Sequence, residues 1–477
     1  MKKLRNLIDL LSEADIEAIH SSFYRKSDKV ATLFQLLIDG MTNEEIREHL
    51  QISLNAYTTL GSRLNNKIQN HLVEISDSPK DDILKKLRSL DDLLFIEEPG
   101  IALVTLKKLE RELIKYDLSN ELTVVYKHLK RLHINKPDYF NYSKLYNRHV
   151  AYSLALDKAE DILSNYFKEY GFFYVMKDEE RAVKLNALFE EMINVSALYQ
   201  SHRMQVYKSA IEIMHRLHVN PVASKRDDRR PIESIFAEVD TIFAKYPQDS
   251  IYINLRLVFR AFQFEYYFYY LIIDKADDLQ MELKPNIPQL LVHYENYGFS
   301  AQVLNGLLHL QLTGIKTSDP IILYRLPDDL SINGISDPSV VMIYVYNAMC
   351  KFYQREYGKA AKLLFELGNT VSFKEYYLLH AEIKCITALI KFYQKDLLLF
   401  TQNLASAKRL LRKLNKSSVP QLVAMIKLLG ILVSKNDENR DERLLKQISI
   451  MENTGLSGYN PLSYLKLDHK SLISLIQ

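Results

Sequence analysis

The 477-residue sequence is poor in the residues that interrupt helices, with only 13 Gly and 13 Pro. A protein of this length that was rich in β-sheet would need many more turn-forming residues. Leu, Lys, Glu and Ala, which favour helices, recur throughout the chain. We therefore predict an all-α fold of long helices joined by short connections.

Cysteines and long apolar runs are also scarce. The two cysteines, Cys350 and Cys385, lie in apolar helical patterns, which indicates free thiols in a reducing compartment rather than a disulfide framework. The longest apolar stretch, residues 266–273, is far shorter than the roughly 20 residues of a membrane-spanning helix. Asp9 and Glu13 interrupt the apolar segment behind the basic N-terminus, so no signal peptide is expected. The sequence predicts a cytoplasmic protein that does not enter a membrane.

The chain has no clear excess of positive charge. It contains 62 Lys and Arg against 59 Asp and Glu, a formal charge of +3. A domain built mainly to hold phosphate backbones is normally clearly basic. The sequence also contains no G-x-x-x-x-G-K phosphate loop, no G-x-G-x-x-G and no G-x-S-x-G element. These features argue against nucleotide-dependent and serine-hydrolase chemistry.

Two pairs of Glu and His stand at a spacing that can bind metal. They are Glu17 with His20 and Glu212 with His215, three residues apart in each case. On a helix each pair could share an ion, but a di-metal centre also needs two more inward-facing glutamates in the same bundle. The two pairs lie in different segments of the chain, so we interpret them as ordinary helical histidines. We expect no metal, no cofactor and no catalytic residue.

The distribution of apolar residues and breaks predicts the domain organisation. Leu103, Leu106, Leu109 and Leu113 fall on one helical face, and similar patterns continue to the C-terminus. A polar link follows residue 75, so we predict a small helical module at residues 1–76. Residues 77–477 are predicted to form an α-solenoid of antiparallel helix pairs. The stretch from about 140 to 340 is compatible with either generic helical repeats or a bundle.

An internal repeat is the clearest feature of the C-terminal half. Residues 351–357 read KFYQREY, and residues 391–397, forty positions later, read KFYQKDL. Four of the seven positions are identical, and Ala348 and Ala388 match at the same offset. A period of this size corresponds to one helix pair with its turns.

The first copy continues with Tyr357 and Ala360, a Tyr-x-x-Ala element that would open the next helix. Together with the preceding aromatic pair and the short polar turn, it resembles the tetratricopeptide repeat over residues 341–415. The resemblance implies that the small Ala lets paired helices pack closely while aromatic residues fill the space between repeats. The chain departs from the family in its turn, which is one residue short, in its period, which exceeds about 34 residues, and in Leu397, which replaces Tyr.

Tetratricopeptide proteins hold peptides on a concave surface. The resemblance implies that Tyr353, Gln354, Tyr393 and Gln394 lie near such a surface and bind a protein or peptide partner. The alternative is that this aromatic stripe only fills the core, as aromatic residues often do. We predict a non-enzymatic interaction scaffold or adaptor.

Residues 40–68 contain a second pattern. Thr42 stands at a helix-capping position, Ile46 and Leu50 would face the core, and Ser53 would cap the next helix. The order of these residues resembles the helix-turn-helix of LuxR-type regulators. The resemblance implies a transcriptional regulator that contacts DNA through residues such as Arg63 and Lys67.

Other features of the N-terminal module oppose DNA binding. Arg47 stands where the LuxR-type motif has a small residue, and residues 1–75 carry nine basic and ten acidic side chains. We therefore interpret the module as a helical hairpin that begins the array or docks a partner. A regulator whose repeats sense a peptide or dimerise is the alternative.

Overall fold

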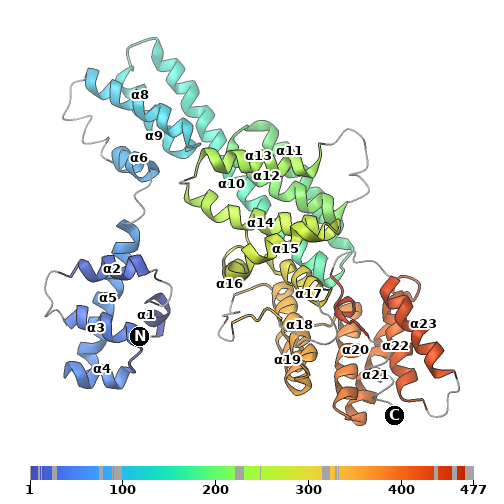
Figure 1. The fold of residues 1–477 in the computed structure, drawn as a ribbon. Helices are drawn as coiled ribbons and strands as arrows, with labels where there is room; N and C mark the ends of the chain where they lie inside the picture. The colour runs from blue at the N-terminus through green and yellow to red at the C-terminus, as the bar shows by residue number, and fades with distance from the viewer. Residues whose placement is uncertain are drawn as a thin grey trace. The chain divides into compact units, whose positions relative to one another are not determined.

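The structure is a computed structural model. It describes residues 2–8, 11, 13–23, 29–74, 79–88, 90, 99–220, 230–247, 249–313, 323–327, 330, 332, 334–434, 439–453 and 459–467. Every regular element within these ranges is a helix, and none is a strand (Figure 1). The predicted all-α fold is confirmed. Backbone contacts divide the chain into two compact units, unit 1 (Met1–Glu112) and unit 2 (Leu113–Gln477).

Unit 1 contains a small helical core at its N-terminal end. Its helices are α1 Lys2–Ile8, α2 Glu13–Ser21, α3 Lys29–Ile38, α4 Asn43–Leu50, α5 Leu54–Glu74, α6 Pro79–Arg88 and the start of α8 Pro99–Lys115. Apolar side chains of α1 to α5, including Phe34, Ile46 and Leu64, form one buried cluster. These five helices therefore bury a core of their own. Residues 75–78 lie outside the described ranges, so the predicted boundary at residue 76 stays a prediction.

The segment from α4 to α5 has the local structure that its sequence predicts. The Thr42 hydroxyl accepts a hydrogen bond from the Glu45 backbone N–H at 3.4 Å, and the Glu45 carboxylate accepts one from the Thr42 N–H at 2.8 Å. This reciprocal pair satisfies free N–H groups at the start of α4. The Ser53 hydroxyl accepts a hydrogen bond from the Ala56 N–H at 3.3 Å, and Ile46 is fully buried. Two helices joined by a three-residue turn result.

Unit 2 is a longer series of helices. Its first part comprises α9 Ser119–Leu132, α10 Asp138–Met176, α11 Glu180–Leu198, α12 His202–Met214, the π-helix η1 His215–Val219, α13 Ile232–Lys245, α14 Ser250–Tyr269, α15 Ile273–Leu283, η3 Lys284–Asn286, α16 Ile287–His293, η4 Ser300–Gln302 and α17 Val303–Thr313. Its second part comprises α18 Asp337–Tyr353, α19 Tyr357–Thr370, α20 Tyr377–Tyr393, α21 Leu397–Leu411, α22 Pro420–Leu432, α23 Arg440–Asn453 and η5 Pro461–Tyr464.

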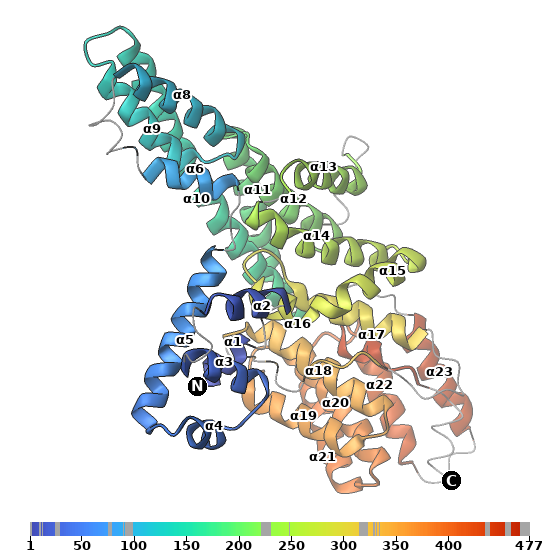
Figure 2. The same cartoon turned by 60° about the vertical axis from the view of Figure 1, so that its left-hand side comes forward.

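Helices that follow one another in unit 2 pack as neighbouring pairs. The pairs with the most extensive contact are α9 with α10, α10 with α11, α18 with α19, α20 with α21, and α22 with α23. Two views show α18 to α23 lying side by side (Figures 1 and 2). This arrangement agrees with the predicted helical-repeat fold. No helix in the described part of the chain is both long and apolar enough to cross a membrane.

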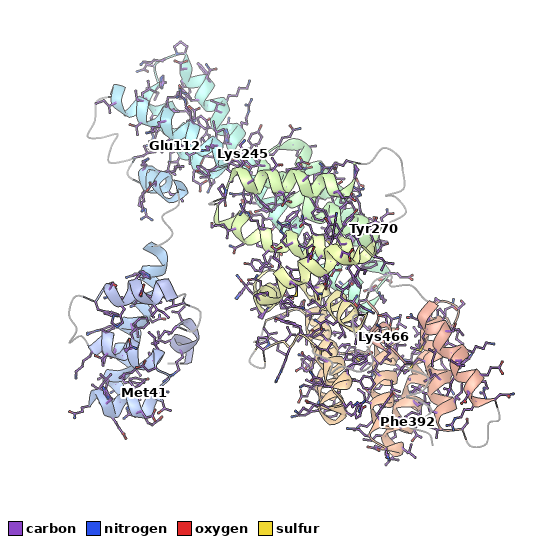
Figure 3. All side chains as sticks on the ribbon, viewed as in Figure 1. Met41, Glu112, Lys245, Tyr270, Phe392 and Lys466 are labelled. Carbon is purple, nitrogen blue, oxygen red and sulfur yellow. The ribbon has the colours of Figure 1, made fainter. Side chains whose placement is uncertain are left out.

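The C-terminal segment 459–467 packs against several helices of unit 2. Tyr459 and Tyr464 are fully buried, and a 3.2 Å hydrogen bond joins Ser463 to His309 of α17. Lys466, labelled in Figure 3, donates a hydrogen bond from its ammonium group to the backbone carbonyl of Leu312 at the end of α17. Residues more than 150 positions apart in the sequence therefore share one core.

Close packing in this core depends on glycine at helical positions such as Gly306. A Cβ atom on Gly306 of α17 would lie 2.6 Å from Cε1 of the buried Phe264 ring, well inside van der Waals contact. Around Gly430 of α22 a Cβ atom would meet nothing within 4 Å.

We expect Gly306→Ala to lower the free energy of unfolding by about 1–3 kcal/mol, because the Phe264 ring must move in a tightly packed core. Gly430→Ala is the matched control. It should raise the free energy of unfolding by up to about 1 kcal/mol, because Ala favours a helix over Gly. Urea unfolding followed by circular dichroism measures both changes. Equal effects of the two substitutions would contradict this account of the core.

Candidate partner-binding grooves

The internal sequence repeat is a structural repeat. Helices α18 and α20 have 17 residues each and end at Tyr353 and Tyr393. Helices α19 and α21 begin at Tyr357 and Leu397, again forty positions apart. Each repeat is thus one pair of helices joined by the same short turn.

The turns of the two repeats have the same backbone geometry. Arg355 and Lys395 both adopt the left-handed conformation, with φ of 62° and 61°. Their N–H groups donate hydrogen bonds of 2.9 Å to the carbonyls of Phe352 and Phe392. This pattern ends a helix by satisfying its last free carbonyls. The turn is therefore a property of the repeated KFYQ sequence.

Aromatic side chains lie between the two repeats. Tyr393 packs edge-on against Phe352, with ring centroids 5.4 Å apart, and tilts over Tyr357 at 5.0 Å. Within the first repeat, Ala360 of α19 is fully buried, and Phe400 occupies the equivalent position in α21. The small residue that the tetratricopeptide resemblance expects at this position is therefore present only in the first repeat.

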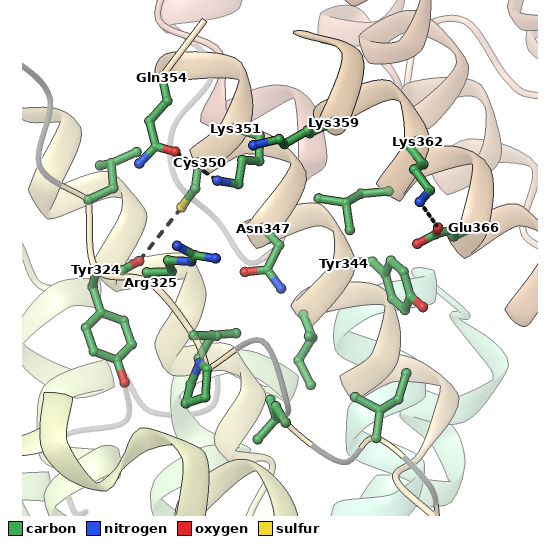
Figure 4. Close-up of a pocket in the computed structure, with 17 residues that line it drawn as sticks. Tyr324, Arg325, Tyr344, Asn347, Cys350, Lys351, Gln354, Lys359, Lys362 and Glu366 are labelled. Atoms are coloured by element: carbon green, nitrogen blue, oxygen red, sulfur yellow. Dashed lines mark hydrogen bonds and ion pairs between the residues drawn. The ribbon is translucent and has the colours of Figure 1, made fainter. Parts of the chain in front are cut away.

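A groove opens beside the first helix pair. This first groove, with a volume of about 520 Å³, lies between α18, α19 and the non-helical segment 323–327 (Figure 4). Leu323 and Leu326 of that segment are buried. The hydroxyl of Tyr346 donates a 2.7 Å hydrogen bond to the Tyr324 carbonyl. A non-helical stretch of the chain thus lies along α18 and forms one wall of the groove.

The charges around the first groove are partly balanced. Lys351 lies 3.2 Å from the Glu356 carboxylate, and its ammonium also donates to Gln354 at 3.3 Å. Lys359 also pairs with Glu356, at 2.8 Å, and Lys362 and Glu366 form an ion pair of 3.7 Å (Figure 4).

A second groove of about 440 Å³ lies one repeat further, between α19, α20 and α21. The two grooves have equivalent floors on α18 and α20, formed by side chains four residues apart that fall on one helical face. The equivalent floor residues are Ile343 and Ile383, Asn347 and Thr387, and Lys351 and Lys391. The wall that segment 323–327 provides in the first groove is provided by α19 in the second.

The four predicted partner-binding residues lie in different surroundings in the structure. Gln354 lines the first groove. The Tyr353 hydroxyl donates to the Tyr464 carbonyl and accepts from the Lys466 N–H at 2.9 Å, so it joins α18 to the C-terminal segment. Tyr393 packs between the repeats, as described above, and Gln394 accepts a 2.9 Å hydrogen bond from Lys391. Their roles in partner binding stay predictions.

The two predicted DNA-contacting residues lie on α5. Arg63 is exposed. Lys67 donates a 3.0 Å hydrogen bond to the Ser22 carbonyl, and its ammonium lies 3.9 Å from the centroid of the Phe23 ring. Lys67 therefore already joins α5 to the end of α2, whereas DNA contact by either residue stays a prediction.

The sequence contains a signal for the residues of the two groove floors, which are not among the four predicted partner-binding residues. The residue pairs at positions 343 and 383 and at positions 351 and 391 are identical, and both pairs stand at the forty-residue offset of the repeat. An alignment of the two copies that extends towards the N-terminal ends of α18 and α20 identifies these floor residues.

Buried carboxyl groups lie in the core of unit 2. Glu382 of α20 and Glu265 of α14 are almost completely inaccessible to solvent. Burial raises the pKa of each carboxyl to about 8, because it disfavours the charged form, and the charge of Lys177 partly opposes this for Glu382. Both carboxyls are therefore largely neutral at neutral pH.

Two histidines in the same core are held in the neutral form. Burial lowers the pKa of His218 to about 3, with a smaller contribution from the Lys177 charge. Burial likewise lowers the pKa of His309 to about 4, and the charge of Lys466 acts in the same direction. The core of unit 2 thus contains groups whose charge states differ from those in the unfolded chain.

The Glu212 and His215 pair is engaged within the chain. Glu212 forms ion pairs with Arg216 at 3.4 Å and Arg230 at 3.3 Å. His215 stacks on Phe189 with ring centroids 4.2 Å apart. Over the described ranges, no three His, Cys, Asp or Glu side chains form a group that could hold a metal ion.

Comparison with protein-family models, with curated proteins and with solved structures finds no match to this chain. The repeat and its two grooves are therefore the features from which a function can be argued.

Proposed function

We propose that this protein is a non-enzymatic interaction scaffold that binds an extended segment of a partner protein in the grooves of its helix pairs. The observation that carries the proposal is the recurrence of a groove with an equivalent floor in both repeats. A surface that repeats with the fold can contact successive parts of one bound chain.

The chemistry of the floors supports the same proposal. Each floor presents an apolar side chain, a neutral polar group and an ammonium group along one face of a helix. Neutral polar groups such as Asn347 and Thr387 can hydrogen-bond to the backbone of an extended segment, while Ile343 and Ile383 contact its side chains. Segment 323–327 is an example within the chain, because α18 already binds a non-helical stretch through apolar contacts and a hydrogen bond to a backbone carbonyl.

The resemblance to the tetratricopeptide repeat supports the proposal from a second direction, since members of that family bind peptides on their repeats. The longer period and the replacement of the small residue by Phe400 would make this chain an unusual relative.

Photo-cross-linking tests where the partner binds. Phe365 of α19 lines the second groove and is 70% exposed, whereas Phe140 of α10 is 75% exposed and lies outside both grooves. We expect p-benzoylphenylalanine at position 365 to cross-link to a partner in a cell lysate, and the same residue at position 140 to give little product. Mass spectrometry of the products measures the difference. Cross-linking of the same proteins from both positions would show that the grooves do not select a partner.

A transcriptional regulator is a second candidate. The observation that favours it is the α4–turn–α5 arrangement, with both of its predicted capping interactions formed. In this candidate, the exposed Arg63 side chain would contact DNA while the repeats bind a peptide.

A further inference from the structure

The second groove differs from the first in its charge. Its lining includes the basic side chains Lys362, His380, Lys384 and Lys391, and none of its lining residues is acidic. In the first groove Glu366 is part of the lining, and Glu356 is paired with Lys351. Two grooves of the same architecture therefore offer different electrostatic surroundings to a bound chain.

The difference arises from exchanges between the two copies of the repeat, among them Tyr344 in the first and Lys384 in the second. Glu356 of the first repeat is replaced by Asp396 in the second. The shorter carboxylate of Asp396 accepts a 3.0 Å hydrogen bond from the Leu399 N–H and caps α21. In the described part of the chain, the ion pairs do not include Lys391, whose ammonium instead donates to the Gln394 amide oxygen at 2.9 Å. The positive charge on the floor of the second groove thus has no carboxylate partner among the described residues.

Lys384 adds a second ammonium group to this surface. Burial and the charges of Lys384 and Arg409 lower the pKa of His380, so its imidazole is neutral at neutral pH, and burial also lowers the pKa of Lys384. No acidic side chain lines the second groove, so a bound carboxylate would stabilise the charged form of Lys384. Apolar side chains adjoin the charges, because Phe365 and Leu399 line the same groove and both are exposed.

We infer that the second groove binds an acidic stretch of the partner, with carboxylate side chains at Lys384 and Lys391 and an apolar residue against Ile383 and Phe365. This inference rests on the proposed function and specifies the partner segment. Charge-assisted hydrogen bonds from lysine to carboxylate would supply the selectivity, and the apolar contacts would supply affinity that does not depend on salt.

A defined peptide pair tests the inference with the full-length protein. The probe is a fluorescein-labelled, C-terminally amidated peptide of alternating Glu and Leu, and its counterpart has Gln in place of Glu. We expect fluorescence anisotropy to show binding of the Glu peptide that weakens with salt, and no comparable binding of the Gln peptide. Lys391→Gln and Lys384→Gln should each weaken binding by about tenfold, the loss of one charge-assisted hydrogen bond. Lys351→Gln is the matched control at the equivalent position of the first groove, and should change binding by less than about twofold.

Three results would overturn the inference. They are equal binding of the Glu and Gln peptides, an equal effect of Lys351→Gln and Lys391→Gln, and binding of polyphosphate or an oligonucleotide with the same dependence on Lys384 and Lys391 while the Glu peptide does not bind. If cross-linking from position 365 still captures a partner in any of these cases, the proposed function stands and only the acidic character of the segment is wrong. Circular dichroism of each Gln variant confirms that the helices are intact.

Discussion

The free energy of unfolding of unit 2 is expected to fall steeply between about pH 6.5 and pH 8. The carboxyls of Glu265 and Glu382 titrate at about 8 in the folded protein and at 4.5 when unperturbed. Between these values the folded state holds more protons than the unfolded state, so raising the pH favours unfolding. Each carboxyl contributes up to about 1.4 kcal/mol per pH unit in this window, and about half of that at pH 8, where it is half-ionised.

The buried histidines have the opposite effect at lower pH. His218 and His309 titrate at about 3 and about 4 in the folded protein and at 6.5 when unperturbed. Between these values the unfolded state holds more protons, so the free energy of unfolding rises with pH. The two effects oppose each other between about pH 4.5 and 6.5. Above pH 6.5 only the carboxyls still titrate among these four groups, so the free energy of unfolding is predicted to fall from about pH 6.5 upwards.

A double variant isolates the carboxyl effect. Glu265→Gln combined with Glu382→Gln should be more stable than the wild type at pH 8. The free energy of unfolding of this double variant should lose most of its dependence on pH between pH 6.5 and 8. Glu190→Gln, an exposed carboxyl on α11, is the control and should retain the slope. Urea unfolding followed by the near-ultraviolet circular dichroism of the tyrosines measures each case. A wild-type slope that persists in the double variant would show that Glu265 and Glu382 are not its source.

The largest expected effect on binding comes from filling the second groove. Thr387 lies on the groove floor, and its hydroxyl donates a 2.8 Å hydrogen bond to the Ile383 carbonyl within α20. Thr387→Trp would place an indole in a groove of about 440 Å³ and exclude a bound segment. We expect partner capture to fall by at least about tenfold, a loss of roughly 1.4 kcal/mol or more in binding free energy.

A matched substitution controls for the effect of the indole itself. Thr401 of α21 is exposed, bonds back to a carbonyl of its own helix and does not line the groove. Thr401→Trp should leave partner capture unchanged. Quantitative mass spectrometry of captured proteins compares the two variants with the wild type, and equal losses would remove the second groove from the account.

The fold could be predicted from the sequence because its signals are local. The scarcity of Gly and Pro indicates helices, and the KFYQ repeat encodes the turn in which Arg355 and Lys395 take the same left-handed conformation. Leu106, Leu109 and Leu113, predicted to share a helical face, are all buried in α8. Local periodicity is sufficient for such features because backbone hydrogen bonding and one apolar face decide them.

The positions of the candidate groove residues could be predicted only in part. Gln354 lines a groove, but the Tyr353 hydroxyl bonds to Tyr464, 111 positions away. Nothing near Tyr353 in the sequence indicates this partner, because the contact depends on where the C-terminal segment packs. The sequence also does not show which side of a helix faces the core. Glu382 is buried in the core, whereas Lys384, two residues later, lines the second groove.

The central claim is that the repeats, and not the N-terminal module, hold the partner. The measurement that tests it most directly is capture of proteins from a nuclease-treated lysate by the wild type, Thr387→Trp and Arg63→Glu, each as the full chain. The account predicts that Thr387→Trp loses the partner and that Arg63→Glu retains it. Loss with Arg63→Glu and retention with Thr387→Trp would contradict the account and favour the regulator.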